Sequence, residues 1–157
     1  DLCFSSPLAR ARKTAELILD SQAGEVPVIE DKRIQEINFG ELEGVICFND
    51  AHEYLNPEME KFFTNPWRFK RPKHGENIAD ILARTKDFWD EKIHDPSLLD
   101  KTILIASHGC AVRALLQNVY QDPENFWHGC VPPNCSVNVV EVRDGQAVLL
   151  EEDKVYA

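Results

Sequence analysis

An apolar run from Thr102 to Ala106 that leads directly into Ser107-His108-Gly109 constrains the fold more than any other feature. Its β-rich composition is typical of a buried strand in a parallel sheet, and a helix is expected from about Cys110 to Tyr120. In open parallel sheets, ligands bind at the carboxyl ends of strands, beside helix N-termini that offer N–H groups to an anion. His108 is therefore a candidate functional residue, although by position alone a structural histidine fits equally well.

The first residues repeat this layout. Leu2-Cys3-Phe4 reads as the end of a strand, and Ser6-Pro7 predicts a helix start at Ser6 that continues to about Asp20. Arg10 lies near the end of the first turn, and its side chain leans toward the helix N-terminus, so its guanidinium can reach the same end of the sheet. A planar, permanently charged guanidinium is well suited to holding a phosphate.

The rest of the chain alternates extended and helical patterns without a repeat or a linker, which predicts one α/β domain over residues 1–157. Residues 26–34 read as extended, and Asn49 or Asp50 could open a helix that Pro57 interrupts. Asn77 and Asp80 resemble a capping box before a helix that ends near Ile93. Residues 135–150 predict a terminal hairpin around Asp144-Gly145.

Charge and hydropathy limit the partners. The formal net charge of −10 opposes binding to nucleic acid or to an anionic membrane, so an anionic ligand would need a local positive pocket. No apolar run approaches the roughly 20 residues that span a bilayer, and the N-terminus lacks a signal-peptide pattern. A cytoplasmic protein is expected.

The five cysteines are an odd number without a Cys-x-x-Cys pair, which favours free thiols over a disulfide framework or a zinc ribbon. His128, Cys130 and Cys135 come closest to a metal-ligand set, but free thiols remain the preferred interpretation. No metal or other cofactor is expected.

Glu36 is the third candidate. A carboxylate beside a phosphate site can protonate the leaving oxygen if its surroundings raise its pKa. Taken alone, however, Glu36 reads as a surface carboxylate.

Four motifs follow one another in a specific order: Ser5-Ser6-Pro7-Leu8-Ala9-Arg10-Ala11-Arg12-Lys13-Thr14-Ala15, Glu36 with Phe39-Gly40 and Glu43-Gly44, Gly75-Glu76-Asn77 with Arg84, and Ser107-His108-Gly109. Together with Asn134-Cys135-Ser136 they resemble the histidine phosphatase superfamily, the phosphoglycerate mutase-like family, over nearly the whole chain. The resemblance implies a three-layer α/β sandwich with a mostly parallel central sheet flanked by helices. It makes Arg10 and His108 phosphate-pocket residues, with Gly109 beside them, and Glu36 the proton donor.

The nucleophile of that family is a second histidine, in an Arg-His-Gly motif that ends the first strand, and this chain contains no Arg-His-Gly. His52, His74, His94 and His128 lie in predicted loops or helices and do not replace it. A Cys-x5-Arg phosphatase loop is excluded because no arginine stands six residues after a cysteine. We therefore expect an N-terminally incomplete domain that lacks its first strand and is inactive as given, in preference to an evolved pseudoenzyme.

Residues 45–74 fall where the family varies its cap over the active site. A basic cluster in this segment is a candidate for attracting a phosphorylated substrate, but a solvated, salt-bridged surface face fits it at least as well. The cluster and the possible pocket-rim residue beside it are Arg68, Lys70, Arg71 and Lys73, followed by His74.

The resemblance implies a phosphomonoester hydrolase that acts, in the complete protein, through a phosphohistidine on a phosphorylated small molecule. A phosphoglycerate mutase and a non-catalytic module that binds a phosphorylated ligand are the alternatives. The sequence leaves the ester and the oligomeric state open.

Overall fold

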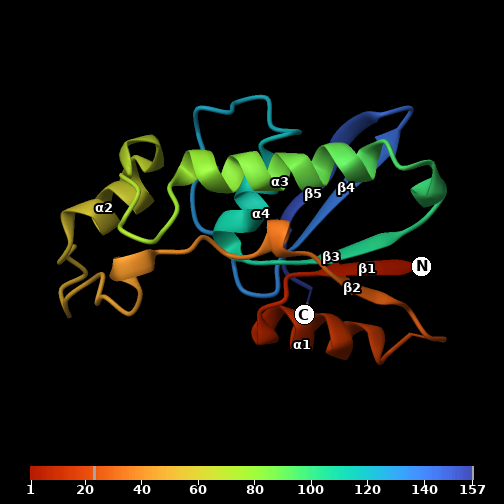
Figure 1. The fold of residues 1–157 in the computed structure, drawn as a ribbon, viewed down its shortest axis with the longest axis horizontal. Helices are drawn as coiled ribbons and strands as arrows, with labels where there is room; N and C mark the ends of the chain where they lie inside the picture. Colours follow the sequence, from red (N-terminus) through yellow and green to blue (C-terminus); the bar gives the residue numbers. More distant parts are fainter. Residues whose placement is uncertain (23, 157) are drawn as a thin grey trace.

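A three-stranded parallel sheet lies at the centre of the computed structural model, which describes residues 1–22 and 24–156 (Figure 1). β1 (Leu2–Ser5) lies between β2 (Val28–Glu30) and β3 (Ile103–Ala106). α1 (Ala9–Leu19) covers one face of the sheet, and α3 (Ile78–Ile93) and α4 (Gly109–Leu116) cover the other. The expected α/β fold with helices flanking a parallel sheet is confirmed.

The alternation of side chains along β1 joins the layers. Cys3 is buried with Ala15 of α1 and Ala106 of β3. Phe4 points to the opposite face, where its ring meets Phe88 of α3 edge-on at a centroid distance of 5.5 Å and packs near Leu115 of α4. Successive residues of a strand face opposite sides, so four residues suffice to anchor both helical layers.

A second, antiparallel sheet consists of β4 (Val137–Arg143) and β5 (Gln146–Lys154), joined at Asp144-Gly145. It confirms the expected terminal hairpin. Within the described ranges no strand pairs with the edge of β3 that faces away from β1. The parallel strand predicted at Thr102–Ala106 is present as β3, but its predicted burial is wrong among the described residues, because β3 borders the sheet and Ile105 remains 38% exposed.

Two predicted helix starts are wrong. α1 begins at Ala9 with Leu8 as its N-cap, so Ser6 is not the cap. α2 (Pro57–Thr64) begins at Pro57 instead of being interrupted by it. Asn56 caps this helix, because its side-chain oxygen accepts hydrogen bonds from the N–H groups of Glu58 and Met59. Proline is tolerated at the first helical position because no hydrogen bond requires its missing N–H there.

Other boundaries are local adjustments. The capping box at Asn77 and Asp80 is confirmed, and α3 ends at Ile93 as expected. α4 stops at Leu116, four residues earlier than predicted. The extended stretch is limited to β2, and short 3-10 turns follow at Lys32–Ile34, Gly40–Leu42, Pro66–Arg68 and Pro96–Leu98.

The segment 45–74 lies beyond the carboxyl ends of β1 and β3 (Figure 1). Its helix α2 buries Met59 and Phe62 in the same cluster as Ile78 and Ile81 of α3 and Trp127. The segment is therefore packed onto the helical layer next to the strand ends. None of the helices in the described part of the chain has the length and apolar character needed to cross a membrane.

Candidate functional site

His108 lies at the carboxyl end of β3, where it forms the N-cap position of α4. Arg10 donates from Nε to His108 Nδ1 at 3.1 Å, and Ser6 Oγ lies 2.8 Å from His108 Nε2. Because arginine can only donate, Nδ1 must be unprotonated, which places the proton of the neutral ring on Nε2. The Nε2–H group then donates to Ser6, whose Oγ also accepts from the N–H of Leu8 at 3.3 Å.

This environment keeps the imidazole neutral. Burial, followed by the positive charges of Arg10 and Arg84, lowers the pKa of His108 to about 4. Each of these effects disfavours a cationic ring. Near neutral pH the formal positive charge at this end of the sheet therefore comes from the arginines, and His108 contributes hydrogen bonds.

Glu36 lies at the N-terminus of α4. Its Oε2 accepts from the N–H of Cys110 at 3.2 Å, and its Oε1 accepts from Ala111 at 3.1 Å and from Ile37 at 3.0 Å. The sequence predicted that the first N–H groups of this helix would face an external anion. The structure corrects this, because two of them already hold the carboxylate of Glu36.

The Glu36 carboxyl has a raised pKa. Burial is the largest cause, and it outweighs the three N–H bonds and the charge of Arg10, which act in the opposite direction. A carboxyl that keeps its proton to higher pH is a better general acid near neutrality. Glu36 is thus a partly buried group and not the surface carboxylate that its sequence context alone suggests.

Gly109 is the first residue of α4, between His108 and the N–H groups that bind Glu36. A Cβ at this position would lie 3.0 Å from Val131 Cγ1 and 3.9 Å from Glu36 Oε2. The absence of a side chain allows the loop around Val131 to approach the start of α4, whereas Glu36 would stay at ordinary contact distance from a Cβ.

Ser6 and Arg84 also contact this cluster. The sequence predicts Ser6 only as a helix cap and Arg84 only as part of a motif. In the structure, Arg84 Nη2 donates to the main-chain oxygen of Glu36 at 3.1 Å. Their positions inside recognisable motifs were a signal, but the contacts join residues from distant parts of the chain.

The basic cluster is less closely connected. Arg71 pairs with Asp80 of the α3 capping box, and the main-chain N–H of Lys70 donates to Glu58 Oε2 at 3.1 Å. Arg68 is exposed in the turn Pro66–Arg68. Across residues 1–22 and 24–156, no hydrogen bond or ion pair joins these three side chains to Arg10, Glu36 or His108.

The main chain around His74 contacts the loop that carries Glu36. Asn38 donates from Nδ2 to the oxygen of His74 at 3.2 Å, and Glu41 donates its N–H to Lys73 at 3.1 Å. A Cβ on Gly40 would lie only 2.2 Å from the oxygen of Lys73. The end of the segment 45–74 and the loop after Glu36 therefore form a tight backbone seam.

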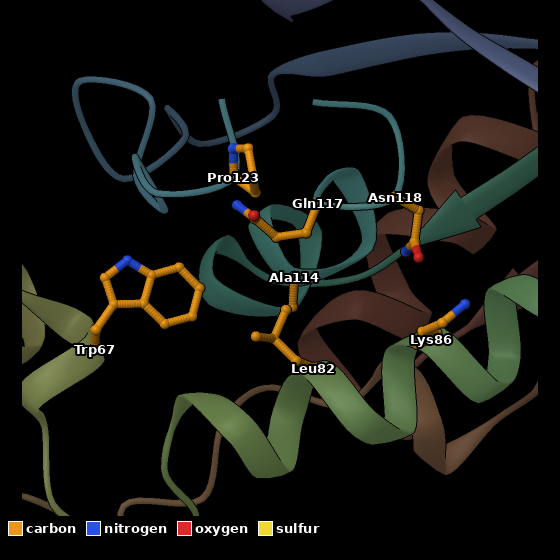
Figure 2. A pocket seen from close by; sticks show the side chains of 7 residues that line it. All are labelled: Trp67, Leu82, Lys86, Ala114, Gln117, Asn118 and Pro123. Atoms are coloured by element: carbon orange, nitrogen blue, oxygen red, sulfur yellow. The ribbon is translucent and has the colours of Figure 1, made fainter. Parts of the chain in front are cut away.

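A cavity of about 290 Å³ lies elsewhere, between α3 and α4 (Figure 2). Trp67, Leu82 and Ala114 provide apolar walls, while Gln117 and Lys86 lie at its sides. None of its lining residues is a sequence-predicted site residue. The candidate site is instead the cluster of Arg10, Glu36 and His108 at the strand ends.

Comparison with known proteins adds a family. The model of the histidine phosphatase superfamily (branch 1) matches residues 1–153. A 2,3-bisphosphoglycerate-dependent phosphoglycerate mutase 2 from Gloeobacter violaceus is 33% identical over 122 residues, which cover 75% of this chain and 53% of that protein. The chain thus spans about half the length of this relative.

Solved structures share the fold. Bacillus stearothermophilus YhfR has a TM-score of 0.81 at 23% identity, with 99% of this chain and 74% of that chain covered. A phosphoserine phosphatase mutant (H9A) from Entamoeba histolytica, in complex with phosphoserine, has a TM-score of 0.65 at 25% identity, with 96% and 72% covered.

Proposed function

Because this chain belongs to branch 1 of the histidine phosphatase superfamily, we propose that the complete protein is a phosphomonoester hydrolase that works through a phosphohistidine. The observation that carries the proposal is the cluster at the strand ends. There an arginine contacts a neutral histidine, and a carboxyl with a raised pKa lies at the start of the same helix.

In the proposed reaction, a histidine nitrogen attacks phosphorus while the bond between phosphorus and the ester oxygen breaks. Glu36 gives its proton to the leaving oxygen, which departs as an alcohol. Arg10 and the start of α4 at Gly109 donate hydrogen bonds to the transferring phosphoryl group, and His108 joins them once the anion displaces Arg10 from Nδ1 and this nitrogen takes up a proton. Water then attacks the phosphohistidine, and the Glu36 carboxylate takes up the proton that water loses.

The proposed nucleophilic histidine is not among residues 1–157. We place it on a strand that precedes Asp1 and pairs with the edge of β3 that has no partner among the described residues. That position would end the added strand beside His108. The chain from Asp1 to Ala157 would then bind phosphate without turning it over.

The segment 45–74 is the proposed cap over the substrate. Arg68, Lys70 and His74 are its candidate substrate contacts, together with Arg71 once Arg71 is released from Asp80. The positive charges of Arg68, Lys70 and Arg71 would attract a phosphorylated small molecule to a chain that is otherwise acidic.

The test is phosphate release from p-nitrophenyl phosphate by the complete protein. We expect turnover by the complete protein, loss of at least about 100-fold in kcat for Glu36→Gln and for His108→Ala, and no turnover by residues 1–157 alone. Full activity in both variants would refute the assignment. Phosphate binding without hydrolysis by the complete protein would favour a non-catalytic binding module.

Phosphoglycerate mutase is the second candidate, because a relative with 33% identity carries that name. A mutase moves the phosphoryl group between two hydroxyls of phosphoglycerate faster than it releases phosphate. Parallel assays of phosphate release and of conversion between 3- and 2-phosphoglycerate decide between the two. We expect hydrolysis to be the faster reaction.

A further inference from the structure

We infer that Arg84 of α3 is a positioning residue, which with Glu76 holds the loop that carries Glu36 against the start of α4. The inference rests on the proposed function, because it explains how the proposed proton donor is kept in place. Arg84 touches neither substrate nor reacting atoms in this scheme and acts through Glu36.

The Arg84 guanidinium uses all five of its N–H groups within this small region. Nη1 donates to the main-chain oxygens of Arg33 and Gln35, both at 2.8 Å, and Nη2 donates to that of Glu36 at 3.1 Å. Nε and Nη2 also grip the Glu76 carboxylate, at 2.7 and 2.9 Å. Five donors in a fixed plane meet five acceptors, three of which are consecutive or nearly consecutive carbonyls of one loop.

Glu76 extends the clamp to the far side of Glu36. Its Oε2 accepts from the N–H of Asn38 at 3.0 Å, and its own N–H donates to the oxygen of Asn38 at 2.7 Å. Ser107, directly before His108, donates from Oγ to the oxygen of Ile34 at 2.8 Å. The loop is thus fixed on both sides of the proposed acid.

The clamp determines where the Glu36 carboxylate lies. With its main chain held by Arg84, the Glu36 side chain extends to the N–H groups of Cys110 and Ala111. A loop released from α3 would let water reach this carboxylate, and burial is the main reason for its raised pKa. Lysine cannot replace the clamp, because an ammonium group has three donors and no planar fork.

The test uses variants that keep every formal charge, so that an effect on Glu36 reports geometry. Arg84→Lys removes the fork, and Glu76→Asp shortens the carboxylate that links Arg84 to Asn38. Arg33→Lys is the matched control: its guanidinium also joins this loop to α3, through Asp31, Asp87 and Glu91, but donates nothing to residues 34–38.

The first measurement is the pKa of the Glu36 carboxyl. It is obtained from carbon-13 NMR spectra recorded during a pH titration of residues 1–157. We expect this pKa to fall toward the ordinary glutamate value in Arg84→Lys and in Glu76→Asp, and to be unchanged in Arg33→Lys. A role confined to stability would lower the melting temperature of the variants without moving this pKa in the folded protein.

The second measurement is kcat and KM of the complete protein as a function of pH. We expect kcat to fall about 10-fold in Arg84→Lys and Glu76→Asp, with KM unchanged and the high-pH limb of the profile shifted to lower pH. If both variants match Arg33→Lys in pKa and pH profile, the positioning role is wrong. Glu36→Gln tests the proposed function separately, since full activity in that variant overturns the acid itself.

Discussion

Arg10 and His108 satisfy each other through one hydrogen bond, from Nε to Nδ1, with 3.1 Å between the nitrogens. The two proposed phosphate ligands thus lie in direct contact before any anion arrives. Burial, followed by the charge of the facing arginine, lowers the pKa of this histidine and keeps its ring neutral. A bound phosphate reverses that balance by adding negative charge beside both groups.

Phosphate is therefore expected to raise the pKa of His108 from about 4 by roughly 1–3 units. Nitrogen-15 NMR of the histidine rings of residues 1–157, with and without inorganic phosphate, measures this shift. Arg10→Gln should weaken the response, whereas the exposed Arg12→Gln should leave it intact. An unchanged His108 titration at saturating phosphate would show that the anion binds elsewhere.

Acid should weaken the fold through the same histidine. The folded pKa of about 4 lies below the ordinary value of 6.5, so between these values the unfolded chain binds more protons. The free energy of unfolding then falls as pH drops from 6.5 to 4, by up to about 1.4 kcal/mol per pH unit from this group. Urea unfolding at several pH values should show a smaller slope in His108→Gln, while the exposed His94→Gln should retain the wild-type slope.

Ser6→Ala should destabilise the protein by about 1–3 kcal/mol, because the buried Nε2–H of His108 and the N–H of Leu8 both lose their acceptor. Thermal or urea unfolding measures the change. Ser21→Ala is the control, since the exposed Ser21 hydroxyl donates to the oxygen of Ile18 near the end of α1. Equal stabilities of the two variants would contradict a stabilising role for the contacts of the Ser6 hydroxyl with His108 and Leu8.

Gly40→Ala should cost about 3 kcal/mol or more, because the backbone at this position has φ +54° and the new Cβ would overlap the oxygen of Lys73. Gly44→Ala separates the two effects. Gly44 also has positive φ, at +74°, but the described residues leave the Cβ position open, so about 1–2 kcal/mol is expected. Similar losses of unfolding free energy in both variants would show that the backbone around Gly40 and Lys73 can move to make room for the new Cβ.

The elements predicted correctly are those with local causes. The capping box at Asn77 and Asp80 and the hairpin turn at Asp144-Gly145 depend on neighbouring residues, and both are present. Pro57 was misread because proline breaks a helix in its interior but suits its first position. The two cases differ only in where the helix begins relative to the proline.

The sequence names Arg10, Glu36 and His108 as candidates, but it does not predict the contacts that join them. Glu36 reads as a surface group because its burial depends on α4, which begins more than 70 residues later. The contact of Ser6 with His108 and the clamp of Arg84 are equally non-local. A motif can indicate that such residues belong together, but the partners of each atom follow from the packed fold.

The backbone seam at Gly40 and Lys73 has a mechanical consequence. Glu41 donates to the oxygen of Lys73, and Asn38 exchanges hydrogen bonds with Glu76. The segment 38–41, which follows Glu36, is therefore hydrogen-bonded to the segment 73–76, which leads into α3. A displacement of one of these two segments would therefore displace the other. Any movement at the end of the proposed cap, residues 45–74, would accordingly be transmitted to the loop that carries the proposed acid.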